Sequence, residues 1–201
     1  MKNKVALIVV HEVYSVNEHM QDVISRFSSS QIDVFCPNLL QLDAPFHYNE
    51  EQKAYSHFMK NIGFQCGREQ IEEMVTMLSK DYAYIGLIGF SIGATIAWLC
   101  SNNLKVNFVI GCYGSRIRDY LQITPTCPTL LIFPESETSF SVSSLITELQ
   151  NHYSLLLQIE QLPGEHGYLN SYTTKYNDQS TKRAYNRIDS FLLENLLEIM
   201  Y

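Results

Sequence analysis

Long apolar runs are absent from this sequence of 201 residues. The longest, such as VALIVV at residues 5–10, fall far short of the roughly 20 residues that a membrane-spanning helix needs. That first run also stops at His11 without the small-residue cleavage site of a secretory signal. We therefore expect a cytoplasmic protein with no membrane partner.

Basic residues are in the minority, with 14 Lys and Arg against 21 Asp and Glu. The formal net charge of -7 argues against a nucleic-acid partner, because binding to phosphates requires a basic face.

The five cysteines are odd in number and include no C-x-x-C pair, so we expect reduced thiols. The glycines at positions 86, 89 and 93 match neither the dinucleotide-binding pattern nor a phosphate-binding loop. We expect no metal and no organic cofactor.

Short apolar stretches alternate with amphipathic helical patterns along the chain. The stretches are continuously apolar and rich in β-branched residues, as in strands buried on both faces of a parallel sheet. The predicted strands cover residues 4–11, 32–38, 82–90, 105–114, 128–135 and 155–162. The predicted helices cover residues 15–29, 71–78, 92–102, 142–149 and 179–201. This alternation predicts one domain, residues 1–201, of the α/β class, with a mostly parallel sheet and helices on both faces.

Two local features go beyond this pattern. Ser15 and Glu18 have the spacing of a capping box and predict where the first helix begins. Residues 41–67 are rich in aromatic side chains but weakly periodic, so we expect a short helix within a long loop that acts as a lid. The aromatic residues of that segment either line a site or pack a surface loop; they are Phe46, Tyr48, Tyr55 and Phe58.

A lone serine stands between glycines where a predicted strand passes into a helix. Ser91 is flanked by Gly89 and Gly93 in the stretch GFSIG. G-x-S-x-G between a buried strand and a helix is the nucleophile-elbow pattern, in which the turn is too sharp for larger flanking side chains. The turn aims the first N–H groups of the helix at the reacting carbonyl oxygen. The alternative is an ordinary tight turn that favours small residues.

A serine hydroxyl needs a base, and in this fold an acid and then a histidine follow the serine along the chain. Two histidines follow Ser91. His152 falls at the end of an amphipathic helix, whereas His166 follows the last predicted strand. Ligand sites lie beyond the carboxyl ends of parallel strands, so His166 is the expected partner.

The acid has few candidates, because no aspartate occurs between Asp119 and Asp178. The stretch PESETSF, which follows a predicted strand, offers Glu135 and Glu137. Either carboxylate could orient the histidine and stabilise its protonated form. Spacing alone does not choose between the two.

With these residues in place, the sequence resembles the dienelactone hydrolase family of α/β-hydrolases over nearly its whole length. VVHEVYSVNEHMQDVISRF is similar to the first block of the family, and GFSIGA is similar to its nucleophile block. LLIFPESE is similar to the segment that bears the acid, where Glu137 falls on the aspartate position of the family. LPGEHGYLN and AYNRIDSFLLENL are similar to the histidine block and the closing helix.

The resemblance implies an α/β-hydrolase fold and gives each residue a role. Ser91 is the expected nucleophile, His166 the general base and acid, and Glu137 the acid that orients the histidine. The backbone N–H groups of Val13 and Ile92 would form the oxyanion hole.

Glu12 matches a family glutamate that lies beside the nucleophile; the alternative is a solvated or salt-bridged carboxylate at a strand end.

The chain departs from the founding members at three places. They carry cysteine where this chain has Ser91, and aspartate where it has Glu137. They also hold a substrate carboxylate with an arginine where this chain has YLNSY, residues 168–172. Without that guanidinium we expect a substrate other than dienelactone.

The implied function is that of a carboxylic ester hydrolase. It would cleave an ester or lactone of a small molecule through an acyl-enzyme, as a monomer or a homodimer. Two alternatives stay open. One is a thioesterase or acyltransferase that uses the same residues. The other is a non-catalytic ligand-binding protein on a hydrolase scaffold, whose only support in the sequence is the glutamate at the acid position.

Overall fold

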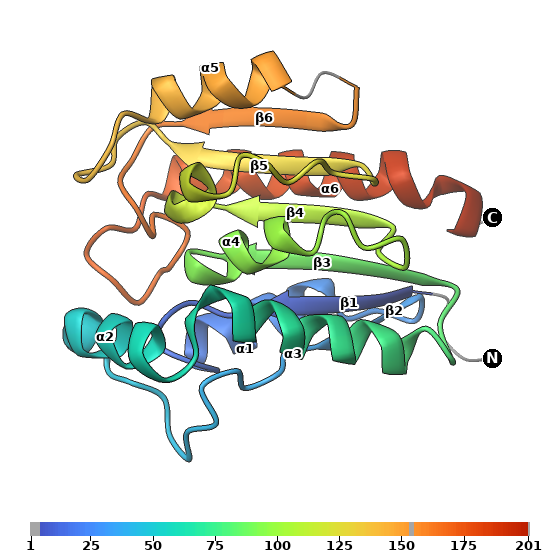
Figure 1. The fold of residues 1–201 in the computed structure, drawn as a ribbon, viewed down its shortest axis with the longest axis horizontal. Coiled ribbons are helices and arrows are strands. Elements are labelled where there is room, and N and C mark those ends of the chain that lie inside the picture. The colour runs from blue at the N-terminus through green and yellow to red at the C-terminus, as the bar shows by residue number, and fades with distance from the viewer. Residues whose placement is uncertain (1–4, 153–154, 201) are drawn as a thin grey trace.

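A parallel sheet forms the centre of the molecule (Figure 1). The computed structural model describes residues 5–152 and 155–200. Within these ranges the strands are β1 Val5–Val10, β2 Ile32–Phe35, β3 Tyr84–Phe90, β4 Phe108–Cys112, β5 Thr129–Pro134 and β6 Leu157–Leu162. Every neighbouring pair is parallel, and the strand order is β2-β1-β3-β4-β5-β6. The predicted α/β fold with a parallel sheet is confirmed.

Helices cover both faces of the sheet. Those described are α1 Glu18–Phe27, α2 Glu51–Asn61, α3 Gly63–Leu78, α4 Ile92–Leu99, α5 Val142–His152 and α6 Asp178–Met200, with short 3-10 helices η1 Tyr48–Glu50 and η2 Ser115–Asp119. Apolar residues of α1 and α6 pack on one face, and those of α2, α3, α4 and α5 pack on the other. None of the described helices is both long and apolar enough to cross a bilayer.

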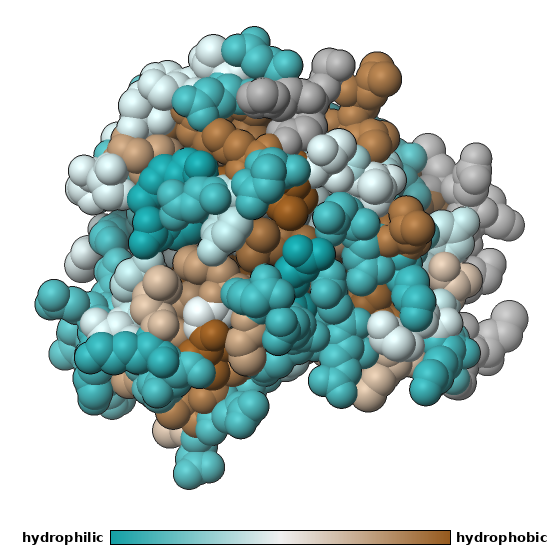
Figure 2. Space-filling view, in the orientation of Figure 1, coloured by the Kyte–Doolittle hydropathy of each residue, from teal (hydrophilic) through white to brown (hydrophobic). Residues whose placement is uncertain are grey.

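Strand β1 shows why its sequence is apolar without a break. Val5, Leu7 and Val9 belong to the core that α1 and α6 cover, whereas Ala6 and Ile8 belong to the core on the opposite face. Successive side chains of a strand point to opposite faces, so a strand covered on both sides buries every residue. On the face shown in Figure 2, polar residues cover most of the surface and apolar residues are visible between them.

Two expectations about local structure need correction. Helix α1 begins at Glu18, and its N-cap is Asn17, whose side chain accepts a hydrogen bond from the Met20 N–H at 3.1 Å. Ser15 instead has a positive φ of 73° and donates its hydroxyl to Asn38, so the predicted capping box is wrong. Residues 48–61 form η1 and α2, so the segment expected to be mainly a loop is largely helical.

The carboxyl ends of the strands meet at one edge of the sheet. All the arrows in Figure 1 point toward α2 and the loop after β6. Glu12, Ser91 and Tyr113 follow β1, β3 and β4 within two residues. Glu137 and His166 follow β5 and β6 within four residues. The parallel topology alone therefore brings these five side chains, far apart in the sequence, to the same edge.

Helix α4 lies unusually close to the sheet at its first turn. A Cβ at position 93 would clash with the carbonyl oxygen of Val10 in β1, and a Cβ at position 89 would clash with the carbonyl oxygen of Gly93. Both obstacles are backbone atoms, which cannot rotate away as a side chain can. Glycine at 89 and 93 therefore allows the approach that sets the position of Ser91.

We expect Gly93→Ala to lower the free energy of unfolding by about 3 kcal/mol, because α4 must move away from β1 to make room. The urea midpoint of unfolding, at an unchanged slope, measures this loss. Gly67→Ala in α3 is the matched control. Its new Cβ would lie 2.7 Å from Cδ1 of Ile96, the end of a side chain that can rotate. Equal midpoints for the two variants would contradict the close-packing argument.

Candidate active site

Ser91 occupies a strained turn between β3 and α4. Its φ of 55° and ψ of -115° lie where a residue with a side chain rarely sits. The Ser91 N–H donates to the carbonyl of Cys112 at the end of β4, at 3.0 Å. This bond and the close packing of α4 hold the strained backbone, which projects Oγ beyond the edge of the sheet.

His166 lies in a turn that two glycines shape. Gly164 and Gly167 have φ values of 128° and 85°, which favour glycine. Tyr168 and Leu169, the next residues, are buried in the core under α6 and anchor the turn. The result is a fixed imidazole whose Nε2 lies 2.8 Å from Ser91 Oγ.

Glu137 completes a hydrogen-bonded chain with these two residues. Its Oε1 lies 2.6 Å from His166 Nδ1, and only 6% of its side chain is exposed. A carboxylate accepts, so Nδ1–H donates to Glu137 and leaves Nε2 as the acceptor for the Ser91 hydroxyl. Glu135 is exposed, and its backbone carbonyl, not its carboxylate, accepts from Gln161. The structure thus brings together Ser91, His166 and Glu137, and leaves Glu135 outside.

Two N–H groups lie close to this chain without an acceptor. Val13 is part of the turn after β1, and Ile92 is the first residue of α4. Within the described part of the chain neither N–H donates a hydrogen bond. Both residues line the space in front of Ser91. Free N–H groups at the start of a helix and in an adjoining turn are suited to bind a negatively charged oxygen.

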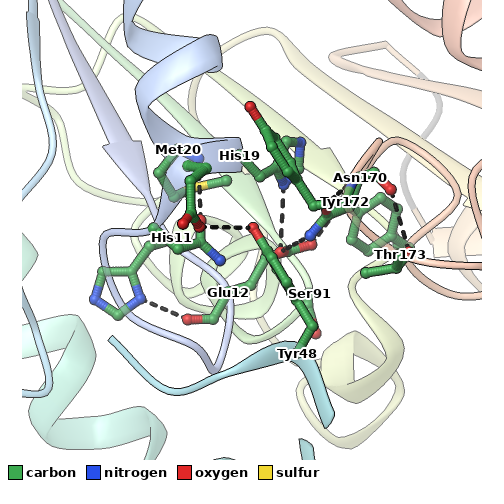
Figure 3. A network of polar contacts seen from close by, with 12 residues as sticks. His11, Glu12, His19, Met20, Tyr48, Ser91, Asn170, Tyr172 and Thr173 are labelled. Carbon is green, nitrogen blue, oxygen red and sulfur yellow. Dashed lines mark hydrogen bonds and ion pairs between the residues drawn. The ribbon is translucent and has the colours of Figure 1, made fainter. Parts of the chain in front are cut away.

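Glu12 is a buried carboxylate in a polar network (Figure 3). It is 3% exposed, and it accepts from Tyr113 Oη at 2.9 Å and from Asn170 Nδ2 at 3.0 Å. His19 Nδ1 lies 3.3 Å from its second oxygen. Burial acts to raise the pKa of Glu12, but the His19 ring and the Tyr113 hydroxyl outweigh burial and lower it. A charged Glu12 is thus stabilised beside Ser91 rather than exposed to solvent.

Two cavities meet at Ser91. The smaller, of about 350 Å³, is lined by Tyr14, Tyr48 and Tyr172 and is called the tyrosine chamber below. The larger, of about 750 Å³, is lined by Arg116 and Arg118 among other polar residues and is called the charged chamber. The residues common to both are Val13, Glu51, Ser91, His166 and Lys175.

The aromatic segment before α3 divides between the two expected roles. Tyr48 lines the tyrosine chamber and Tyr55 lines the charged chamber. Phe58 is fully buried, and Phe46 packs against the same core. The segment therefore supplies both core and site, and of these four aromatic residues only the two tyrosines line the cavities. Among the side chains that the structure describes, no group of three from His, Cys, Asp or Glu could hold a metal ion.

Comparison with known proteins identifies the family. The model of the family described as "Dienelactone hydrolase family" matches residues 1–196. The chain belongs to this family. This membership confirms the resemblance drawn from the sequence and the expected enzyme class, an ester hydrolase.

Three individual proteins illustrate what this chain is similar to. "Uncharacterized protein YczH" of Bacillus subtilis (strain 168) is 38% identical over 174 residues, which are 87% of this chain and 85% of the relative. "Putative carboxymethylenebutenolidase" of Synechocystis sp. (strain ATCC 27184 / PCC 6803 / Kazusa) is 22% identical over 90% of this chain and 82% of its own. Among solved structures, a "Putative Dienelactone Hydrolase" from Klebsiella pneumoniae subsp. pneumoniae MGH 78578 has a TM-score of 0.80 at 16% identity and covers 95% of this chain and 88% of its own.

Several polar residues of this dienelactone hydrolase family member were not predicted from its sequence. Tyr113 donates to Glu12, and its ring meets the His166 ring edge-on at 5.2 Å between centroids. Asn170 and His19 hold the other oxygen of Glu12. Tyr113 follows β4 directly and Asn170 follows His166 by four residues. Position at a strand end was therefore a usable signal for Tyr113, whereas His19 lies inside a helix and gave none.

His11 is fixed as a neutral ring next to Glu12. Its Nδ1 lies 2.6 Å from the Glu12 carbonyl oxygen, to which Nδ1–H donates, and Nε2 accepts from the Leu39 N–H at 3.0 Å. Complete burial lowers its pKa from 6.5 to about 4. The ring therefore ties the turn after β1 to the chain after β2.

The lowered pKa of His11 predicts a pH dependence of stability. Between pH 6.5 and 4 the unfolded chain binds a proton at this ring and the folded chain does not, so acidification favours unfolding. We expect this ring alone to remove about 2 kcal/mol from the free energy of unfolding between about pH 7 and pH 5. Urea unfolding at each pH measures the change. His11→Asn should be less stable at neutral pH but flatter over this range; an equally steep slope would contradict the assignment.

Proposed function

We propose that this member of the dienelactone hydrolase family cleaves an ester or lactone of a small molecule through an acyl-enzyme on Ser91. The observation that carries the proposal is the unbroken hydrogen-bonded chain from Ser91 Oγ through His166 to Glu137, at the point where two cavities meet. Such a chain supplies a nucleophile, a base and an orienting carboxylate in one line.

The acylation step follows from the direction of these hydrogen bonds. Ser91 Oγ attacks the carbonyl carbon while its proton passes to His166 Nε2. The negative charge that develops on the carbonyl oxygen would be held by the N–H groups of Val13 and Ile92, each donor lowering the barrier by about 3 kcal/mol. His166 then gives its proton to the oxygen of the leaving alcohol, and the C–O bond breaks.

Deacylation repeats the sequence with water as the nucleophile. His166 takes a proton from water as it attacks the acyl carbon, and returns that proton to Ser91 Oγ as the acid is released. During both steps the imidazole is transiently a cation. Glu137 is hydrogen-bonded to it, and the buried charge of Glu12 attracts it electrostatically. We propose that Glu12 stabilises the imidazolium through its charge. This role is possible with serine at position 91, where the founding members of the family carry cysteine.

The binding-protein alternative has less support than the hydrolase. It rested on glutamate at the acid position, and the Glu137 side chain reaches His166 at 2.6 Å despite its extra methylene. Cleavage of a thioester would use the same residues. We propose a small-molecule substrate, a cytoplasmic location and no nucleic-acid or membrane partner.

We expect Ser91→Ala to lower kcat/KM for p-nitrophenyl acetate by at least about 10³-fold, because the proposed acyl-enzyme forms on the Ser91 hydroxyl. A fluorophosphonate probe should add its mass to the peptide that contains Ser91, and His166→Ala should suppress that labelling. Ser190→Ala, an exposed serine of α6, is the matched control and should behave as the wild type. Rates of Ser91→Ala and wild type that coincide after background subtraction would rule out the hydrolase.

The two candidate acids provide a second, internal comparison. Glu137→Gln keeps the shape of the side chain but removes the charge that orients His166 and stabilises its cation, so kcat should fall by about 10²- to 10⁴-fold. Glu135→Gln, two residues away and exposed, should change kcat less than about twofold. Steady-state kinetics on the same ester measures both. Greater damage from the Glu135 change would show that the acid has been assigned to the wrong residue.

A further inference from the structure

The two cavities at Ser91 differ in chemistry, which bears on the substrate. Apart from a few shared residues, different residues line the two cavities. Two of the shared residues, Glu51 of α2 and Lys175 of the loop after His166, form an ion pair of 3.3 Å. A substrate whose carbonyl carbon lies at Ser91 has room to extend into both. Each chamber can then receive one of the two groups attached to the ester bond.

Three tyrosine rings line the tyrosine chamber, together with polar residues such as Asn170 and Thr173. Tyr14 and Tyr48 meet edge-to-face, with centroids 5.2 Å apart and planes at 67°. Tyr48 and Tyr172 are parallel, with centroids 6.0 Å apart and planes at 9°. They come from three separate segments: the turn after β1, η1 and the loop that follows His166. An additional flat ring could join this set in either of the two geometries that aromatic pairs prefer.

The hydroxyl groups of two of these tyrosines are already engaged. Tyr48 Oη donates to Glu18 at 3.4 Å, and Tyr172 Oη donates to Asp22 at 2.9 Å. Both carboxylates belong to α1. The phenol groups are thus held by the helix, which leaves ring surface as the part of these side chains available to a ligand. Tyr172 is 45% exposed, a large area for a ligand to cover.

The charged chamber differs from the tyrosine chamber in holding two guanidinium groups. Arg116 and Arg118 line it, and Asp119 is paired with Arg116 at 3.0 Å. Thr138 and Ser139 add hydroxyl groups. This environment suits a polar, hydrated group, because an apolar group would desolvate charges without replacing their hydrogen bonds.

We propose that the tyrosine chamber is an aryl subsite, which binds a flat aromatic ring on one side of the scissile ester while the more polar side lies in the charged chamber. The chamber volume of about 350 Å³ lies within the range of small-molecule sites. The inference rests on the proposed function, because the ester must be cleaved at Ser91 for the chamber to act as a substrate pocket. It adds a substrate class, aryl-substituted esters, to that function.

Two pairs of esters test the subsite and identify the side that carries the ring. The first pair compares methyl 3-phenylpropanoate with methyl butanoate and tests a ring on the acyl side of the ester. The second pair compares benzyl acetate with butyl acetate and tests a ring on the alcohol side. A saturated spacer keeps each ring out of conjugation with the carbonyl. Methyl 3-cyclohexylpropanoate and cyclohexylmethyl acetate control for hydrophobicity without flatness. In one pair we expect the aryl ester to exceed both the alkyl and the cyclohexyl ester in kcat/KM.

The variants are Tyr48→Leu and Tyr172→Leu, with Tyr176→Leu as the matched control. Tyr176 is 40% exposed and lines neither chamber. Losing one aromatic contact should lower the aryl-to-alkyl ratio of kcat/KM by about 3- to 10-fold, mainly through KM. The control should keep the wild-type ratio. The Tyr172 ring is more exposed than the Tyr48 ring, so Tyr172→Leu is the less disruptive of the two changes. It keeps the test valid if Tyr48→Leu fails to fold.

The outcomes separate this inference from the proposed function. Hydrolysis that depends on Ser91 but shows no aryl preference in either pair, or a ratio that both tyrosine variants leave unchanged, overturns the aryl subsite alone. If no ester is cleaved in a Ser91-dependent way, the proposed function fails. Calorimetric titration of 3-phenylpropanoate and of benzyl alcohol then decides the subsite. Weaker binding of either by Tyr48→Leu supports it, and unchanged binding of both rejects it.

Discussion

The close contact of α4 with the sheet is the constraint on which the site depends. Gly89 and Gly93 let the first turn of the helix approach the backbone of β1, and Ser91 between them is left with a positive φ. Such a conformation costs about 1–3 kcal/mol and persists only where packing determines it. Here the packing comes from α4 itself, every residue of which is buried. The stability of the core thus fixes the direction of a single hydroxyl group.

Parallel topology supplies the rest of the arrangement. All six described strands end at the same edge, and five of them are followed within a few residues by a side chain of the site. The loops between a strand end and its side chain are short, so small differences in side-chain length are accommodated locally. Glu137 illustrates this: it follows β5 by three residues and reaches His166 with the longer of the two acidic side chains. The fold thus keeps a carboxylate beside His166 at this edge of the sheet, although the residue that supplies it is a glutamate rather than an aspartate.

The sequence predicted the elements better than it predicted their contacts. The strands could be recognised because burial on both faces removes polar residues from them, as in β1. Ser91 and His166 could be placed because the chemistry proposed for them requires a turn at a strand end. The choice of Glu137 came from the family resemblance, since Glu135 has the same chemistry two residues away. Local chemistry also could not separate Ser15 from Asn17 as the N-cap, because both residue types cap helices well.

The side-chain pairings of Glu12 lay beyond prediction for a different reason. Tyr113 and Asn170, which hold its carboxylate, are 101 and 158 residues away in the chain. No local pattern encodes such pairs; they exist only once the strands have found their order.

The same network explains how a buried charge can be kept next to Ser91, the proposed nucleophile. An unpaired carboxylate in the interior would be strongly destabilising, and three donors from separate elements remove most of that cost. Because the donors come from α1, the end of β4 and the loop after β6, Glu12 also ties these elements together at the edge of the sheet. The loop that carries His166 is therefore anchored at two residues. Tyr168 packs in the core, and Asn170 donates a hydrogen bond to Glu12, whose charge attracts the imidazole when it is protonated. In the proposed mechanism, a loop so anchored presents His166 to Ser91 without rearranging between acylation and deacylation.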